Sequence, residues 1–444
     1  MNHMFSSPDF RDLVVGADNC VPVQGKMIPH INFDNAATTP PLKSVLQEMA
    51  DFAPNYASVH RGSGYKSRLT SQFYEQARTE VLNFVNGDRR QDICIFVRNA
   101  TEGINILAHC LSQTEKQKKI ILSSQMEHHS NDLPWRKYFK VVYVQTDPAG
   151  RLDLNDLQAK LQKYRGQIRL VAITGASNVT GYVNPIHKIA ELAHQYDSKI
   201  FIDGAQLIPH CPLDMKPVNS QRHIDYLAFS AHKMYAPYGT GVLIGPKKSF
   251  SAGEPDHVGG GTVNIVTTKL IVWDDPPARD EAGTPNVMGV VALVAAIRTL
   301  TALSMRNVEK QERNLLAYVW PKMKKICDLE LYNQYGPEMI GVIPFNIRGI
   351  PHQLLAHLLA QERGISVRNG CFCAQPYVQK LLNVTDEQII HAMKYPQSPR
   401  PGMVRISFGI YNQKQEIDEF ICILQKIAEN KRYYLNKYRD PYKN

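Results

Sequence analysis

Short runs of apolar, often β-branched residues alternate with segments of helical periodicity through the middle of the chain. The runs that predict strands are residues 93–97, 119–123, 141–145, 169–173, 199–202, 225–229 and 241–244. Helical periodicity fills most of the gaps, as at residues 101–111, 153–163 and 185–195. Strands interleaved with helices indicate an α/β domain around a mostly parallel sheet. The last two strands are joined by a short connection, so we expect one antiparallel strand at an edge.

The pattern changes after about residue 290. A long helical stretch covers residues 289–304 and continues through 308–326, and strands are predicted near 341–346 and 403–408. We therefore expect a large domain at 30–290 and a smaller α+β domain at 291–444, with residues 1–29 packing on the smaller one. The end of the chain, 430–444, mixes basic residues with tyrosines. It is read as a frayed helix or, alternatively, as a docking element for an acidic partner.

Composition and charge narrow the class of protein. The chain has 444 residues, of which 43% are hydrophobic and 21% charged, which excludes a disordered chain. The formal net charge is +10, but no block of like charges predicts nucleic-acid binding. Residues 1–16 lack an apolar signal core, and the apolar run 288–297 is too short to span a membrane. The eight cysteines do not form a secreted disulfide pattern, so we expect a reduced, cytoplasmic protein with no membrane contact.

Two polar groups follow predicted strands and together suggest a cofactor. Asp203 ends the apolar run that begins at Ile200, where ligands bind in open α/β sheets. Further along, Lys233 follows the next strand and is preceded by Ser230 and His232. Each residue alone has an ordinary structural explanation, as a cap or a surface lysine. The combination suits pyridoxal phosphate (PLP), with the lysine as Schiff-base partner, the aspartate on the pyridine nitrogen, and the serine and histidine on the phosphate.

Two further segments add polar side chains after strands. Thr101 lies where a helix is predicted to begin, and a helix N-terminus with a hydroxyl is a phosphate site, although a plain helix cap is an equal alternative. His128 and His129 follow another strand. An imidazole there could stack on a PLP ring and move protons, whereas the pair is a poor zinc pattern. No metal site is predicted.

These motifs, in this order and spacing, resemble a class V enzyme of the fold-type I PLP-dependent transferases. The resemblance covers about residues 30–430 and is greatest to the Suf-type (group II) cysteine desulfurases and selenocysteine lyases. It is carried by Phe33-Asp-Asn-Ala-Ala-Thr-Thr, Ser58-Val-His-Arg-Gly, Glu127-His-His-Ser-Asn-Asp-Leu-Pro-Trp, Ser177-Asn-Val-Thr-Gly, Asp203-Gly-Ala-Gln, Ser230-Ala-His-Lys, Gly259-Gly-Gly, Glu281-Ala-Gly-Thr-Pro-Asn, Arg368-Asn-Gly-Cys-Phe-Cys-Ala-Gln-Pro and Arg405-Ile-Ser-Phe-Gly-Ile-Tyr-Asn. It implies a large domain with a mostly parallel seven-stranded sheet and a smaller α+β domain.

The resemblance also implies a role for each matching residue. Lys233 would bond to PLP and move the Cα proton, Asp203 would pair with the pyridine nitrogen, and Gln206 with the ring oxygen. His128 would stack on the ring, and Thr101, Ser230 and His232 would hold the phosphate. Thr284 would reach the phosphate of a partner subunit, which implies a homodimer. The substrate carboxylate would bind Arg405, with Asn178, Arg368 and the backbone near Ala36 orienting it.

Cys373 occupies the position of the family's sulfur-accepting nucleophile. The resemblance therefore implies a desulfurase that converts L-cysteine to L-alanine, holds a persulfide on Cys373 and passes the sulfur to an acceptor. Selenocysteine lyase, another C–S lyase, or an aminotransferase or epimerase of the same fold are the alternatives. The usual His pair is replaced by Cys371-Phe372, as in molybdenum cofactor sulfurases. Cys371 could be structural, receive sulfur from Cys373, or form a disulfide with it.

Overall fold

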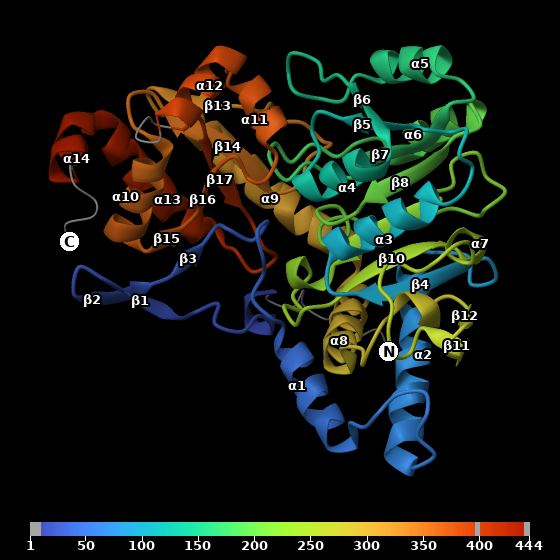
Figure 1. Ribbon diagram of the computed structural model, residues 1–444. Helices are drawn as coiled ribbons and strands as arrows, with labels where there is room; N and C mark the ends of the chain where they lie inside the picture. Colours follow the sequence, from blue (N-terminus) through green and yellow to red (C-terminus); the bar gives the residue numbers. More distant parts are fainter. Residues whose placement is uncertain (1–9, 396–399, 439–444) are drawn as a thin grey trace, which may run out of the picture.

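The computed structural model describes residues 10–395 and 400–438. Residues 1–9 of the predicted N-terminal segment and 439–444 of the C-terminal tail lie outside the described residues, as do 396–399. Figure 1 shows a broad sheet covered by helices and, beside it, a smaller group of strands and helices.

The broad sheet has seven strands, as predicted. Their order across the sheet is β4 (Asp92–Val97), β10 (Gly241–Pro246), β9 (Tyr226–Ser230), β8 (Lys199–Asp203), β7 (Ile168–Thr174), β5 (Ile120–Ser124) and β6 (Lys140–Val144). Every neighbouring pair is parallel except the two that involve β10. The α/β class with a mostly parallel sheet is thereby confirmed.

The expected place of the antiparallel strand was wrong. β10 lies inside the sheet, between β9 and β4, and not at its edge. The short connection after β9 does return the chain antiparallel beside it. However, β4 pairs along the other side of β10 from Val97 to Asp92 and becomes the edge strand itself. An exposed edge attracts a further strand, and here an earlier part of the chain supplies it.

Both faces of this sheet are buried, which explains why its strands read as continuous apolar runs. Side chains alternate between the faces, so that on β4 Ile95 and Val97 join one core and Cys94 and Phe96 the other. The first face is covered by helices α3 (Ala100–Ser112), α4 (Leu133–Tyr138) and α7 (Lys247–Phe250). The second is covered by α2 (Tyr65–Phe84), α5 (Leu154–Lys163), α6 (Ile186–Gln195) and α8 (Val287–Leu303).

A second sheet of four antiparallel strands lies in the C-terminal part. Its order is β13 (Leu329–Leu331), β14 (Val342–Ile347), β17 (Met403–Ser407) and β16 (Arg368–Gly370). Helix α10 (His352–Arg363) contacts this sheet, and α13 (Lys414–Glu429) packs on α10 and on α9 (Met305–Met323). From the N-terminal segment, β1 (Cys20–Val23) and β2 (Lys26–Pro29) form a hairpin that contacts α10 through β1, and β3 (Ile31–Asn32) pairs with β15 (Ile365–Ser366).

The boundary expected at residue 290 lies inside α8. This helix packs on α2 and on α1 (Lys43–Phe52), so the division of the chain into domains stays a prediction. The predicted long helical stretch is two helices, α8 and α9, joined at Ser304. Among the described residues no single helix is long and apolar enough to cross a membrane, although α8 and α9 taken together pass by length and composition, with a bend of 76° between them.

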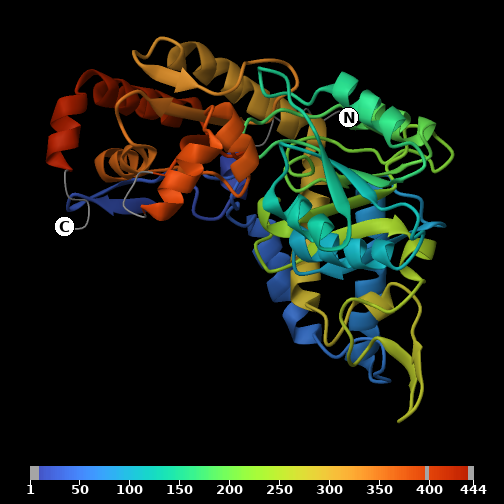
Figure 2. The same cartoon turned by 45° about the horizontal axis from the view of Figure 1, so that its top comes forward.

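The remaining elements are short. The strands β11 (Val263–Val266) and β12 (Ile271–Trp273) form a hairpin that projects from the body in Figure 2. The other helices are α11 (Gln375–Leu381), α12 (Asp386–Lys394) and α14 (Lys431–Lys437), with 3₁₀ turns at Phe10–Leu13, Ala53–Asn55, His129–Asn131, Ala231–Lys233 and Ala278–Asp280. The loops after β5, β7, β8 and β9, the start of α3, and β16 and β17 of the second sheet carry the side chains of the candidate site.

Candidate active site

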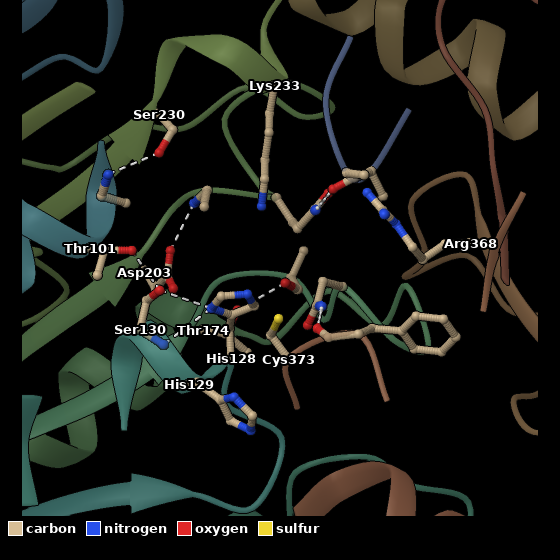
Figure 3. Close-up of a pocket in the computed structure, with 18 of the residues that line it drawn as sticks. Thr101, His128, His129, Ser130, Thr174, Asp203, Ser230, Lys233, Arg368 and Cys373 are labelled. Atoms are coloured by element: carbon tan, nitrogen blue, oxygen red, sulfur yellow. Dashed lines mark hydrogen bonds between the residues drawn. The ribbon is translucent and has the colours of Figure 1, made fainter. Parts of the chain in front are cut away.

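One cavity of about 610 Å³ collects nearly all of the predicted site residues (Figure 3). Those that line it are Ala36, Thr101, His128, Asn178, Asp203, Gln206, Ser230, His232, Lys233, Arg368, Cys373 and Arg405. Thr284 does not line it; this residue lies in two neighbouring hollows on the loop before α8. Segments that are far apart in the sequence thus meet at one place, where the ends of parallel strands face the smaller sheet.

The floor of the cavity holds a carboxylate and an amine. Asp203 ends β8, is buried, and accepts a hydrogen bond of 3.0 Å from the backbone N–H of Ala205. Burial raises the pKa of Asp203. Lys233 ends the 3₁₀ turn that follows β9, and burial, with a further contribution from the charge of Arg405, lowers its pKa to about 8. An amine with this pKa is partly neutral near physiological pH and can act as a base or nucleophile.

The N-terminus of α3 forms another wall. The side chain of Asn99 caps this helix, so the expectation that Thr101 might be only the helix cap is wrong. Thr101 lies in the first turn, and its hydroxyl is 2.7 Å from the hydroxyl of Ser130. The backbone N–H of Ala100 donates to Ser230 Oγ at 2.8 Å. Hydroxyls and N–H groups gathered at the positive end of a helix dipole favour an anion such as a phosphate.

Two imidazoles in the cavity are neutral at physiological pH. Burial, and next the positive charge of Lys233, lowers the pKa of His128 to about 3. The same two causes lower the pKa of His232 to about 4. The His128 ring is held by Ser130, whose backbone N–H lies 3.1 Å from His128 Nδ1. A neutral, fixed ring is suited to stacking on a flat ligand.

The carboxylate of Glu127 fixes the segment that carries His128. Glu127 is fully buried, accepts hydrogen bonds from Ser124 Oγ at 2.5 Å and from Asn131 Nδ2 at 2.6 Å, and has its pKa raised to about 8 by burial. Glu127 lies in a segment that carries the family resemblance, but no role was predicted for it. Its signal was an acidic residue directly before the two histidines, at the end of an apolar strand.

A cluster of charges surrounds the buried Arg405 on β17. Its Nη1 donates to the backbone oxygen of Asn178 at 2.8 Å, and its Nη2 lies 3.2 Å from Asp34 Oδ1. The other oxygen of Asp34 lies 3.2 Å from Arg368 Nε. The guanidinium also lies over the ring of Phe372, 5.0 Å from its centre. Burial, and next the charge of Arg368, lowers the pKa of Arg405 to about 10.

Asp34 was missed as a site residue, although it lies in a segment that carried the family resemblance. The sequence feature that could have identified it is a single acidic residue in the segment that begins at Phe33, which the resemblance places beside Arg368 and Arg405. Burial raises the pKa of Asp34, and both arginines oppose this shift. Ala36 lines the cavity, but its N–H already donates to Ser407 Oγ and its oxygen accepts from Gln206 Nε2.

Cys373 lies in a tight turn that closes the cavity. The N–H of Ala374 donates to the oxygen of Cys371 at 2.8 Å, and the two residues between them, Phe372 and Cys373, have φ of 52° and 54°. Left-handed backbone at two successive residues that are not glycine is costly, and strained backbone of this kind often occurs at functional sites. The backbone oxygen of Cys373 accepts from the N–H of His129 at 2.7 Å. The turn thus holds an exposed thiol over the cavity.

The fold and this cavity define a chain of the α/β class, with its site between the mostly parallel sheet and the smaller four-stranded sheet. Residues 31–420 match the aminotransferase class-V family, so the chain belongs to that family. A cysteine desulfurase from Haloferax volcanii is 30% identical over 90% of each chain, and one from Shigella sonnei is 34% identical over 90% of this chain and 94% of its own. These matches confirm the predicted family.

Solved structures agree with the fold. That of a cysteine desulfurase from Thermococcus onnurineus NA1 has a TM-score of 0.80 at 29% identity and covers 90% of this chain and 95% of its own. The cysteine desulfurase CsdA from Escherichia coli has a TM-score of 0.79 at 28% identity, covering 96% and 99%. The narrower assignment to the Suf-type subgroup stays a prediction.

Proposed function

We propose that this protein is a PLP-dependent cysteine desulfurase that converts L-cysteine to L-alanine and retains the sulfur on Cys373. The observation that carries the proposal is the meeting of four groups in one cavity. The Cys373 thiol, Lys233 and Asp203 are seen in Figure 3, and Arg405 lines the same cavity. A reactive amine, a buried carboxylate, a carboxylate-binding guanidinium and a thiol are the groups that this reaction needs.

The residues present fit PLP. Gln206 lines the cavity, and its buried Oε1 has no hydrogen-bond partner, as expected of a group that awaits a ligand. The N-terminus of α3 with Thr101, together with Ser230 and His232, would hold the phosphate. Asp203 would pair with a protonated pyridine nitrogen, and His128 would cover the ring. Bound there, PLP would withdraw electrons from the substrate Cα and so ease removal of its proton.

Three side chains of the protein would carry out the separate steps of the reaction. Arg405 lines the cavity beside Asp34 and would bind the substrate carboxylate. Lys233 in its neutral form would take the proton from Cα. Cys373, as a thiolate, would attack the substrate sulfur, whose bond to Cβ breaks, so that the sulfur remains on Cys373 as a persulfide. The electron pair of that bond stays with the carbon, which takes up a proton at Cβ and another at Cα before alanine leaves.

The proposed cofactor site also bears on the oligomeric state of the protein. Thr284 lies outside the cavity, so the phosphate contact that the resemblance implies for it would be made in a second copy of the chain. We propose a homodimer on this basis. The sulfur would leave Cys373 for an acceptor protein or small molecule.

The test is to incubate the PLP-loaded protein with L-cysteine and, in parallel, with L-selenocysteine. We expect alanine from L-cysteine, together with an added sulfur on the peptide that contains Cys373, detected by mass spectrometry without reductant. Alanine from selenocysteine alone would indicate a selenocysteine lyase. If the PLP absorbance band is present but neither amino acid yields alanine, the proposal fails.

Replacing Arg405 by lysine tests the carboxylate site. Lysine keeps the charge but loses the fork that binds two oxygens at once. Losing a charge-assisted hydrogen bond costs about 1.5–3 kcal/mol, so we expect KM for L-cysteine to rise roughly ten- to a hundredfold. Arg363→Lys is the matched control, because this exposed arginine on α10 pairs with Glu419 away from the cavity. An unchanged KM in Arg405→Lys would show that this arginine does not hold the substrate.

The lowered pKa of Lys233 predicts how loading depends on pH. Only the neutral amine can bond to the PLP aldehyde, and burial places the pKa of this amine at about 8. The rate at which the visible band appears after PLP is added to the apoprotein should therefore rise with pH and level off above about 8. A rate that climbs on toward the ordinary pKa of a lysine, about 10.4, would contradict the burial effect.

A further inference from the structure

We propose that Cys371 is a second sulfur-handling group, which resolves the persulfide on Cys373 by forming a Cys371–Cys373 disulfide and releasing hydrosulfide. This inference rests on the proposed function, because the persulfide is its substrate. Turnover would then depend on the redox state of the two cysteines. It would cease when the disulfide forms, because Cys373 is no longer a free thiol, and it would resume when a thiol reductant reduces the disulfide.

The turn places the backbones of the two cysteines at a spacing that a disulfide can span. Cys371 and Cys373 both line the same cavity and are the first and third residues of a turn closed by the Ala374 N–H to Cys371 oxygen bond. The positive φ of both central residues is the sign that a type I′ turn requires. Consecutive Cα atoms are about 3.8 Å apart, so the first and third Cα atoms of such a turn lie about 5–6 Å apart, within the span of disulfides.

The surroundings of Cys371 favour the protonated, less reactive form of its thiol. Its Sγ donates to the backbone oxygen of Pro401 at 3.2 Å. Burial, and next the neighbouring Cys373, raises the pKa of the Cys371 thiol. The protonated thiol is a weak nucleophile, so Cys371 reacts slowly. A sulfur acceptor that docks promptly at the exposed Cys373 therefore takes the sulfur first, and Cys371 acts when no acceptor comes.

The step is a thiol–persulfide exchange that balances without an external oxidant. Cys371 leaves the Pro401 oxygen, loses its proton to water and attacks Cys373 Sγ. The bond between Cys373 Sγ and the transferred sulfur breaks as the bond between the two cysteine sulfurs forms. The transferred sulfur takes the electron pair and leaves as hydrosulfide. The Cys371 sulfur is oxidised, the transferred sulfur is reduced, and the Cys373 sulfur keeps its oxidation state.

The experiment is a single-turnover reaction of the PLP-loaded protein with stoichiometric L-cysteine, without acceptor or added reductant, because excess cysteine would itself release the sulfur and reduce the disulfide. Small molecules are removed by rapid desalting before the peptides are analysed. For the wild type we expect sulfide to appear after alanine, and the peptide with both cysteines to become lighter by two hydrogens. In Cys371→Ser the sulfide release should be lost, and the same peptide should keep one added sulfur. Cys422→Ser, at an exposed cysteine on α13, is the matched control and should behave as the wild type.

A second measurement does not depend on turnover. Treating the apoprotein with inorganic polysulfide should load Cys373 directly and give the same disulfide in the wild type but not in Cys371→Ser. Alanine and persulfide without any disulfide would overturn this inference and leave the proposed function intact. An added sulfur found on Cys371 would also overturn it, because Cys371 would then relay the sulfur. Absence of alanine from every variant would instead refute the proposed function.

Discussion

Replacing Lys233 by alanine is expected to abolish both the PLP absorbance band and the release of alanine from L-cysteine. Among the described residues that line the cavity, Lys233 is the one lysine. Its position after β9 and its lowered pKa make it the group that can bond to the cofactor and move the substrate proton. Without it, neither the bond nor the proton transfer has a substitute, so we expect activity to fall by roughly a thousandfold or more.

The control for Lys233→Ala is Lys248→Ala, at an exposed lysine of α7, which should keep the band and the activity. Thermal unfolding separates loss of chemistry from loss of fold. Removing a buried, poorly solvated amine should not lower the melting temperature of the apoprotein, because the charged form is disfavoured by burial. If Lys233→Ala retains the visible band, another amine holds the cofactor and our assignment of the site is wrong.

The strands of the large sheet could be predicted from the sequence alone. Apolar runs such as that before Asp203 are uninterrupted because both faces of the sheet are buried, and this makes each strand recognisable by itself. The polar residue that ends a run must then lie where the strands end, at the border of the sheet that their carboxyl ends form. For this reason Asp203, Ser230 and Lys233 could be placed together before their distances were known.

Contacts between distant segments could not be predicted in the same way. The pairing of β10 with β4 joins residues far apart in the chain, and no local pattern in either strand specifies its neighbour. Asp34 likewise has its role only because β3 brings it beside Arg405 and Arg368. The turn at Phe372 and Cys373 contains neither glycine nor asparagine, so its left-handed backbone had no signature in the sequence.

These missed contacts share a consequence for the site. Asp34 neutralises part of the charge of Arg405 and Arg368 and holds both side chains in place before any substrate binds. The backbone bond from His129 to Cys373 links the segment that would cover the cofactor to the turn that carries the thiol. The two halves of the proposed reaction, at Cα and at sulfur, are thus fixed relative to each other by contacts that only the fold creates.

Replacing Cys373 by serine should separate these two halves. We expect alanine formation from L-cysteine to fall by roughly a thousandfold or more, because a serine hydroxyl stays protonated and cannot accept the sulfur as a thiolate does. The PLP band should remain, since Lys233 is intact, and L-cysteine should still change the spectrum, since Arg405 can still bind its carboxylate. No added sulfur should be found on the peptide that contains residue 373.

The comparison for Cys373→Ser is Cys422→Ser, which removes an exposed thiol from α13 and should leave alanine formation as in the wild type. A serine variant that loses the PLP band would show that the turn had been damaged, and Cys373→Ala would then be measured in its place. If either variant forms alanine at the wild-type rate while the band is present, Cys373 is not the nucleophile. Another thiol would then accept the sulfur, because elimination at the cofactor would yield pyruvate, ammonia and sulfide in place of alanine.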